Sequence, residues 1–163
     1  MRVNSIIRNE RGLTLIELVI VVAIMGILAA AVTPLATLSK KRAKELELKR
    51  DLRTIRTALD NYKKAYDEKR IDNEIGRSGY PESLLELVEG VRDVKDPEGG
   101  RIFFLRRLPR DPMNDNEFIP PHETWQIRAY DNDHDDFSGG DDVYDIRSSS
   151  EDMALDGTAY KDW

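Results

Sequence analysis

The residues with the clearest potential for chemistry form an acidic loop, AYDNDHDDFSGGDDVYD, at positions 129–145. Seven aspartates fall within it: Asp131, Asp133, Asp135, Asp136, Asp141, Asp142 and Asp145. Hard cations such as calcium take six to eight oxygen ligands from the carboxylates and carbonyls of a flexible loop. Gly139 and Gly140 permit the sharp return that such a loop needs. The pattern therefore indicates a calcium site, and the alternative is a solvated acidic loop without metal.

A second chemical group is the lone carboxylate of Glu17, which interrupts an apolar run from Leu13 to Leu38. A carboxylate at the centre of a bilayer costs about 2.5–3.5 kcal/mol on insertion scales, and such residues generally have a partner. Near the end of a span the cost is lower. Glu17 is therefore either a charge that reaches the membrane surface or a group that pairs with a neighbouring molecule.

The rest of the sequence offers little to a catalyst. There is no cysteine, which excludes disulfides and thiolate zinc sites, and the only histidines are His122 and His134. No serine stands in a nucleophile-elbow setting, and no glycine-rich loop opens a helix for a phosphate. The net charge of −6 argues against a nucleic-acid partner. We therefore expect no enzymatic activity and no nucleic-acid binding.

Residues 13–38 have the length and composition of a membrane-spanning helix. As an α-helix the segment extends about 39 Å, which is enough to cross a bilayer. A secretory signal peptide is the alternative, but the helical pattern continues past the apolar part, which favours a retained anchor. Basic residues lie on both sides of the segment, so the positive-inside rule alone does not fix its orientation.

Residues 39–70 are predicted to continue as an amphipathic helix. Apolar residues recur at steps of four and three, which places them on one face: Leu48, Leu52, Ile55, Leu59, Tyr62 and Tyr66. We expect this stripe to pack against the chain's own globular part rather than in a free coiled coil. Pro34 is the only breaker between the two segments, so they are expected to form one long helix with a kink there.

Residues 71–163 are predicted to form a small globular head. A short helix is expected at 81–89, a turn at 96–100, and strands at 101–108, 124–130 and 142–148. The expected fold class is α+β, with a small antiparallel sheet laid against the long helix. From Asp111 onward fifteen acidic residues face only three basic ones, so a basic stem leads into an acidic head.

The string RGLTLIELVIVVAIMG resembles the processing signature of type IV prepilins and of the pseudopilins of type II secretion. The resemblance implies that residues 1–12 are a leader, which a prepilin peptidase removes between Gly12 and Leu13 on the cytoplasmic side. Leu13 would then be N-methylated, although this family usually has phenylalanine there. Glu17 would neutralise the α-amine of Leu13 in a neighbouring subunit, and Pro34 matches the family's helix-loosening proline.

The head resembles that of the G-type major pseudopilin in two short motifs, Gly79-Tyr80-Pro81 and Leu108-Pro109-x-Asp111-Pro112. That resemblance implies calcium held by the side chains of Asp133, Asp141 and Asp142 and by carbonyls near Tyr130 and Asp135. This sequence departs from the family's pattern in two ways. Position 134 is a histidine where the family commonly has glycine, and the chain continues some twenty residues past the loop, whereas the family usually stops sooner.

Together these resemblances imply a structural subunit of a type II secretion filament. Its anchor would cross the inner membrane once, with the N-terminus in the cytoplasm and the head in the periplasm. Its partners would be copies of itself, other pseudopilins, the prepilin peptidase and an inner-membrane assembly platform. A type IV pilin for adhesion, motility or DNA uptake is the alternative, and an anchored enzyme finds no support in the sequence.

Overall fold

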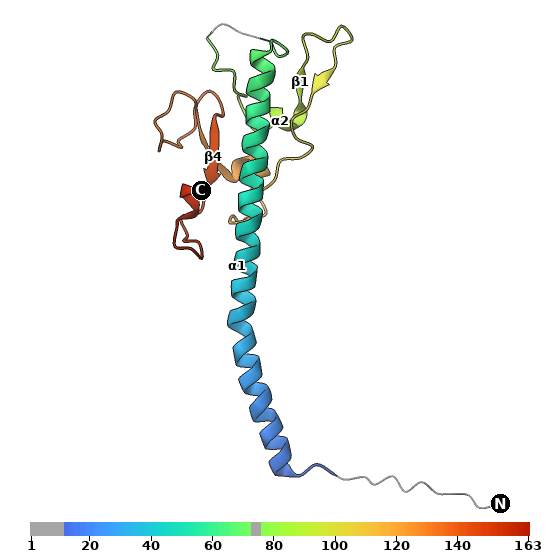
Figure 1. Ribbon diagram of the computed structural model, residues 1–163, viewed down its shortest axis with the longest axis vertical. Coiled ribbons are helices and arrows are strands. Elements are labelled where there is room, and N and C mark those ends of the chain that lie inside the picture. The colour runs from blue at the N-terminus through green and yellow to red at the C-terminus, as the bar shows by residue number, and fades with distance from the viewer. Residues whose placement is uncertain (1–11, 73–75) are drawn as a thin grey trace, which may run out of the picture. The chain divides into compact units, whose positions relative to one another are not determined.

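The computed structural model describes residues 12–72 and 76–163, apart from the side chains of 31–34. The elements in chain order are α1 (Leu15–Asp67), α2 (Glu86–Glu89), β1 (Val91–Arg92), β2 (Arg101–Ile102), η1 (Pro121–Glu123), β3 (Trp125–Arg128), β4 (Asp145–Ser148) and η2 (Tyr160–Asp162). Figure 1 shows their course. The chain divides into two units, one up to Lys40 and one from Lys41 onward. The α+β class is confirmed.

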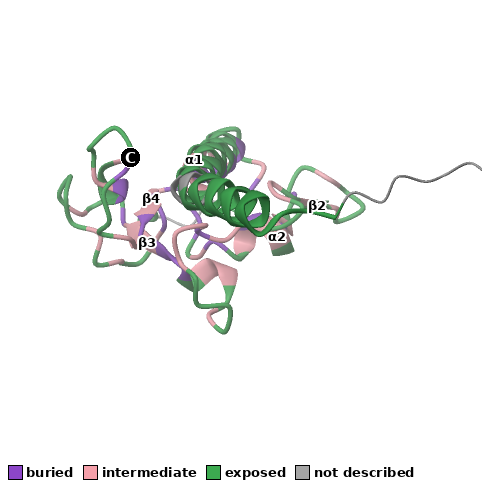
Figure 2. Ribbon diagram, turned by 90° about the horizontal axis from the view of Figure 1, so that it is seen from below, coloured by how far each residue is buried: buried purple, intermediate pink, exposed green. Residues whose placement is uncertain are grey.

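The first unit is a helix whose described apolar side chains are exposed. Every side chain described between positions 12 and 40 is exposed (Figure 2). Large apolar residues such as Leu15 and Ile27 are 81 % and 71 % exposed. By its length and composition α1 can cross a membrane. Most of the leader predicted at 1–12 lies outside the described residues, and only Gly12 falls within them.

Helix α1 continues without interruption through the position of Pro34, so one long helix is confirmed, while the kink stays a prediction. It ends three residues earlier than the sequence indicates. The N–H of Arg70 donates to the carbonyl of Ala65 at 2.9 Å, and that of Lys69 donates to the carbonyl of Tyr66 at 2.8 Å. Lys69 has a φ of 56°, so the helix closes in a Schellman motif with a lysine in the left-handed position.

The core of the second unit is built on the apolar stripe of α1. Leu48, Ile55 and Leu59 are at most 1 % exposed. They pack in one cluster with residues of the head: Leu84, Leu87, Trp125, Val143, Ile146 and Tyr160. The prediction that the stripe packs against the chain's own globular part is therefore confirmed. A face with apolar residues every three or four positions is buried because helix geometry aligns those residues toward one neighbour.

The head contains two antiparallel pairs of strands where the sequence predicts one sheet. Strand β1 pairs with β2, and β3 pairs with β4, with Ile127 opposite Ile146. The strand expected at 101–108 stops at Ile102, because the N–H groups of Phe104 and Leu105 both donate to the carbonyl of Leu87. These bonds turn the chain away from β1 and onto α2. The strands expected at 124–130 and 142–148 shorten to 125–128 and 145–148.

The helix expected at 81–89 was too long at its start, since α2 begins at Glu86. The carbonyl of Pro81 accepts the N–H of Val143 at 2.8 Å. This bond pairs the start of the expected helix with the segment just before β4, so that carbonyl is not used within a helix. The predicted end was right: Gly90, with a φ of 74°, follows the last helical residue and donates to the carbonyl of Glu86. Contacts with a distant segment thus outweigh the local preference for helix at the start of the expected helix, but not at its end.

Candidate functional site

The predicted processing site lies immediately before the first turn of α1. Gly12 and Leu13 are exposed and precede the helix, and among the described residues beyond its chain neighbours none has an atom within 4 Å of a Cβ built on Gly12. Thr14 caps the helix, because its Oγ1 accepts the backbone N–H of Glu17 at 3.3 Å and its carbonyl accepts that of Leu18 at 3.1 Å. The junction between Gly12 and Leu13 is thus open to a peptidase in the described part of the chain.

Glu17 occupies the third helical position, where a carboxylate interacts favourably with the positive end of the helix dipole. The pattern Thr14-x-x-Glu17 is that of a capping box. Thr14 was not among the residues that the sequence singled out, although this spacing was available to find it. Pro34 lies about 26 Å further along the helix and does not belong to the same local site. Cleavage after Gly12 would give Leu13 a free α-amine. Glu17 lies four positions after Leu13, which is about one helical turn.

The acidic loop connects β3 to β4 and is closed by main-chain bonds. The N–H of Tyr144 donates to the carbonyl of Arg128, and that of Gly139 donates to the carbonyl of Ile127, both at 2.9 Å. Within the loop the amide of Asn132 donates to the carbonyl of Gly139 at 2.9 Å. A Cβ on Gly140 would lie 2.5 Å from the Cβ of Ala129, so this glycine is required for the close return of the chain.

The predicted calcium ligands do not converge in this conformation. Oδ1 of Asp142 accepts the backbone N–H of Tyr130 at 2.8 Å, while Asp133, Asp135 and Asp141 are exposed. Across residues 12–72 and 76–163, no three histidine, cysteine or acidic side chains are grouped so that they could hold a metal ion. The side chains as placed do not fit a calcium site, and only Asp142 and the backbone of Tyr130 meet.

Besides Asp142, the loop aspartates Asp145 and Asp136 also accept hydrogen bonds within the protein. Asp145 accepts hydrogen bonds from Nε of Arg56 at 2.8 Å and from Nη2 of Arg128 at 3.4 Å. Asp136 accepts a hydrogen bond from the backbone of Ser138, and hydrogen bonding to Ser138 lowers the pKa of the Asp136 carboxyl. Both carboxylates therefore have hydrogen-bond donors within the protein, which weakens the case for a metal at these two positions.

Arg56 joins α1 to the acidic head. Besides Asp145, its guanidinium donates to the carbonyls of Ile146 at 3.0 Å and Trp163 at 2.9 Å. This role could not be predicted from the sequence, because Arg56 looks like one more charge on the polar side of an amphipathic helix. Its contacts hold the base of the acidic loop against α1.

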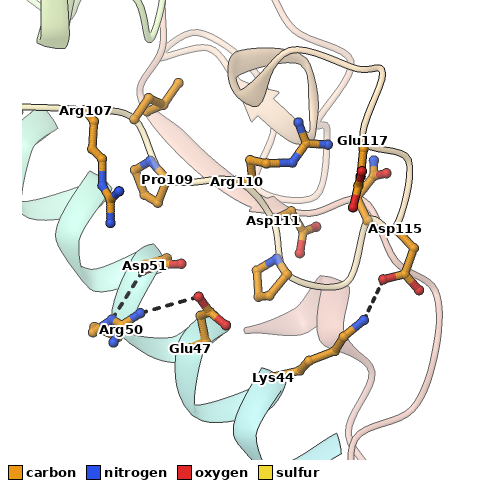
Figure 3. A pocket seen from close by; sticks show the side chains of 13 residues that line it. Lys44, Glu47, Arg50, Asp51, Arg107, Pro109, Arg110, Asp111, Asp115 and Glu117 are labelled. Atoms are coloured by element: carbon orange, nitrogen blue, oxygen red, sulfur yellow. Dashed lines mark hydrogen bonds and ion pairs between the residues drawn. The ribbon is translucent and has the colours of Figure 1, made fainter. Parts of the chain in front are cut away.

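Asp111 is the second anchor, and it lies in one of the motifs that carry the resemblance. The residue is 1 % exposed. One carboxylate oxygen accepts the hydroxyl of Ser148 at 2.6 Å and the N–H of Ser149 at 3.1 Å, and the other accepts the N–H of Met113 at 2.9 Å. Figure 3 shows Asp111 beside the groove between α1 and this segment. Asp111 therefore ties the Leu108–Pro112 motif to the end of β4.

Comparisons with known proteins find one family model and several relatives. A family model described as a prokaryotic N-terminal methylation motif matches residues 7–33. A type II secretion system core protein G of Klebsiella michiganensis is 31 % identical over 140 residues, which are 83 % of this chain and 91 % of the relative. That of Pseudomonas aeruginosa is 34 % identical over 143 residues, covering 83 % and 91 %. That of Vibrio cholerae is 31 % identical over 141 residues, covering 82 % and 87 %.

The chain belongs to the type II secretion system core protein G family. It is a structural pseudopilin and not an enzyme. The predicted cleavage site at Gly12 and Leu13 and the predicted assembly residue Glu17 all fall inside the matched methylation motif, which fits processing by a prepilin peptidase. No solved structure gives a significant match.

We predict that Asp111→Ala destabilises the head of this pseudopilin by about 2–4 kcal/mol, because one buried donor and two partly buried donors lose a charged, buried acceptor. Urea unfolding of a fragment covering residues 41–163 measures the change. Asp115→Ala is the matched control: the Asp115 side chain is 84 % exposed and pairs only with Lys44, so a loss of at most about 1 kcal/mol is expected. Equal stability of the two variants would show that the Asp111 hydrogen bonds are not what holds this segment.

Proposed function

We propose that this pseudopilin is stored in the inner membrane by residues 13–38 and, once processed, polymerises into a periplasmic filament of the secretion system. The observation that carries this proposal is the exposed apolar helix, which must be buried somewhere. Lipid covers it in storage, and identical helices cover it in the filament. The head, whose core is complete without the anchor, remains in the periplasm. Assembly involves other pseudopilins and an inner-membrane platform.

Glu17 is proposed to set the register between subunits. After cleavage the α-amine of Leu13 carries a positive charge one helical turn before the Glu17 carboxylate. A charged group inside an apolar environment gains most from a partner of opposite sign, and that partner can come from the next copy. The distance from the amine to the carboxylate would then determine how far each subunit is displaced from its neighbour.

Mass spectrometry of the N-terminus of the cellular protein tests the processing step. The expected mature chain starts at Leu13, lacks Met1 to Gly12 and carries one methyl group on its α-amine. The Gly12→Ala variant is measured for comparison, because the resemblance places the cleavage by the peptidase directly after Gly12. A mature protein that retains its first twelve residues would contradict the proposal.

Substitution of Glu17 tests its role in assembly. Glu17→Ala should leave membrane insertion intact, since it removes a charge from an apolar segment, and should abolish filaments seen by electron microscopy. Glu68→Ala removes an exposed carboxylate beyond the end of α1 and is expected to have no effect. Filaments of normal length and yield from Glu17→Ala would refute the register role.

Calcium binding to the acidic loop is a separate proposal. It rests on the number of carboxylates in the loop. Binding would require the loop to bring Asp133 and Asp141 toward Asp142, with carbonyls near Tyr130 and Asp135 completing the ligands. Such a rearrangement is compatible with a glycine-containing loop.

Calcium should raise the thermal midpoint of the protein, and a chelator should lower it, because a ligand that binds only the folded state stabilises that state. The variant Asp133→Asn with Asp141→Asn should remove most of this response. Magnesium in place of calcium is the control for general charge screening. A midpoint that is indifferent to calcium and chelator would show that the loop is an ordinary acidic surface.

A further inference from the structure

The acidic loop carries one large apolar side chain, and two arginines contact it. Between positions 131 and 142 that side chain is Phe137, and every other residue there is polar or glycine. The centroid of the Phe137 ring lies 4.2 Å from Cζ of Arg147 and 5.6 Å from Cζ of Arg128. A guanidinium within about 6 Å of a ring centroid is attracted to the face of the ring. Phe137 is therefore partly buried against two cations, whereas the adjacent Asp136 is exposed.

The two arginines are positioned by the pair of strands β3 and β4. In the strand register Gln126 lies opposite Arg147, and Arg128 lies opposite Asp145. Side chains two positions apart on a strand project from the same face, so all four side chains share one face of the pair. Nε of Arg147 donates to Oε1 of Gln126 at 2.8 Å, and Nη2 of Arg128 donates to Oδ2 of Asp145 at 3.4 Å. Strand contacts thus hold both guanidinium groups where the ring meets them.

The surroundings of Arg128 show that aromatic packing determines its position. Its Cζ lies 4.7 Å from the centroid of the Tyr144 ring, in addition to its contact with Phe137. The Arg128 side chain is 14 % exposed, and its Nε atom is buried without a hydrogen-bond partner among the described residues. A buried donor without an acceptor costs free energy, so other contacts must offset that cost. The two aromatic rings supply those contacts.

Hydrogen bonds fold the loop back so that it presents Phe137 to the arginines. The side-chain amide of Asn132 donates to the carbonyl of Asp136 at 3.3 Å and to that of Gly139 at 2.9 Å, one on each side of Phe137. The N–H of Gly139 donates to the carbonyl of Ile127 at 2.9 Å, which joins this turn to β3. The ring is therefore carried by a folded turn that is bound to the same strand as Arg128.

In this conformation the predicted calcium ligands lie apart. Asp133 and Asp141 are exposed, and Oδ1 of Asp142 accepts the N–H of Tyr130. Throughout the part of the chain that the structure describes, no three acidic, histidine or cysteine side chains are grouped to hold a metal ion. The contacts of Phe137 therefore stabilise a loop conformation that does not fit the cation. Convergence of the carboxylates requires a second conformation of the loop.

We propose that Phe137 is a latch for the acidic loop. While its ring contacts Arg128 and Arg147, the carboxylates stay apart, and they converge only after the ring has left. The part of this inference that concerns calcium rests on the calcium binding proposed above. A ligand that binds a fractionally populated conformation has its apparent affinity reduced by that fraction. Loss of the latch should therefore raise the apparent affinity for calcium about fivefold or more, because two cation–π contacts no longer oppose opening.

Hydrogen exchange of the purified full chain, with a chelator present, tests the latch by itself. Phe137→Ala should speed exchange of the amides at 131–142 about fivefold or more, because the bond from Gly139 to Ile127 opens more often. Phe137→Tyr keeps an aromatic ring and should exchange like the unmodified protein. Phe103→Ala is the matched control, since Phe103 is an exposed aromatic residue outside the loop, and it should leave the loop unchanged. Equal exchange in Phe137→Ala and the unmodified protein would overturn the latch.

Calcium titrated into the same proteins by calorimetry separates the latch from the calcium proposal. Tighter binding by Phe137→Ala than by the unmodified protein supports both. Equal or weaker binding by Phe137→Ala overturns the latch and leaves the calcium proposal standing. Absence of binding to either protein overturns the calcium proposal, and the exchange rates then decide the latch alone. Thermal unfolding of each variant confirms that the head is folded.

Discussion

The constraint on which the rest depends is the apolar surface of the first unit, which the chain leaves uncovered. Burial of a single large apolar side chain is worth about 1.5–3 kcal/mol, and more than ten such residues are exposed between Leu13 and Leu38. By its length and composition α1 can cross a membrane. The proposed transfer from lipid to contact with other copies of this helix would bury the surface in both states.

The head is independent of that surface because α1 changes its role at about Lys41. Beyond this point one face of the helix is buried by the chain itself, and the polar side carries anchors such as Arg56. Asp111 and Arg56 act at different places, one on the Leu108–Pro112 motif and one at the base of the acidic loop. Both contacts are charge-assisted hydrogen bonds in partly or fully buried settings, which are stronger than those at an open surface. The proposed assembly would use such a head, because its core is formed within the second unit.

The sequence predicted the parts of the fold that depend on periodicity and failed where distant segments pair. The stripe from Leu48 to Tyr62 was recognisable because helix geometry repeats it locally. The late start of α2 could not be recognised from the sequence, because the hydrogen bond between Pro81 and Val143 joins residues far apart in the chain. For the same reason Arg56 could not be identified from its neighbours. The methylation motif could be recognised because Gly12, Leu13 and Glu17 form a local pattern, whereas ligands in a loop depend on a conformation that spacing does not define.

The burial of the first unit can be measured directly by cysteine accessibility, since the native chain has no competing thiol. Ile27→Cys would be compared with Glu68→Cys for reaction with a charged maleimide, in intact membranes and in isolated filaments. The account predicts that Glu68→Cys reacts in both settings and that Ile27→Cys reacts only after full denaturation. Reaction of Ile27→Cys as fast as Glu68→Cys in either setting would contradict it.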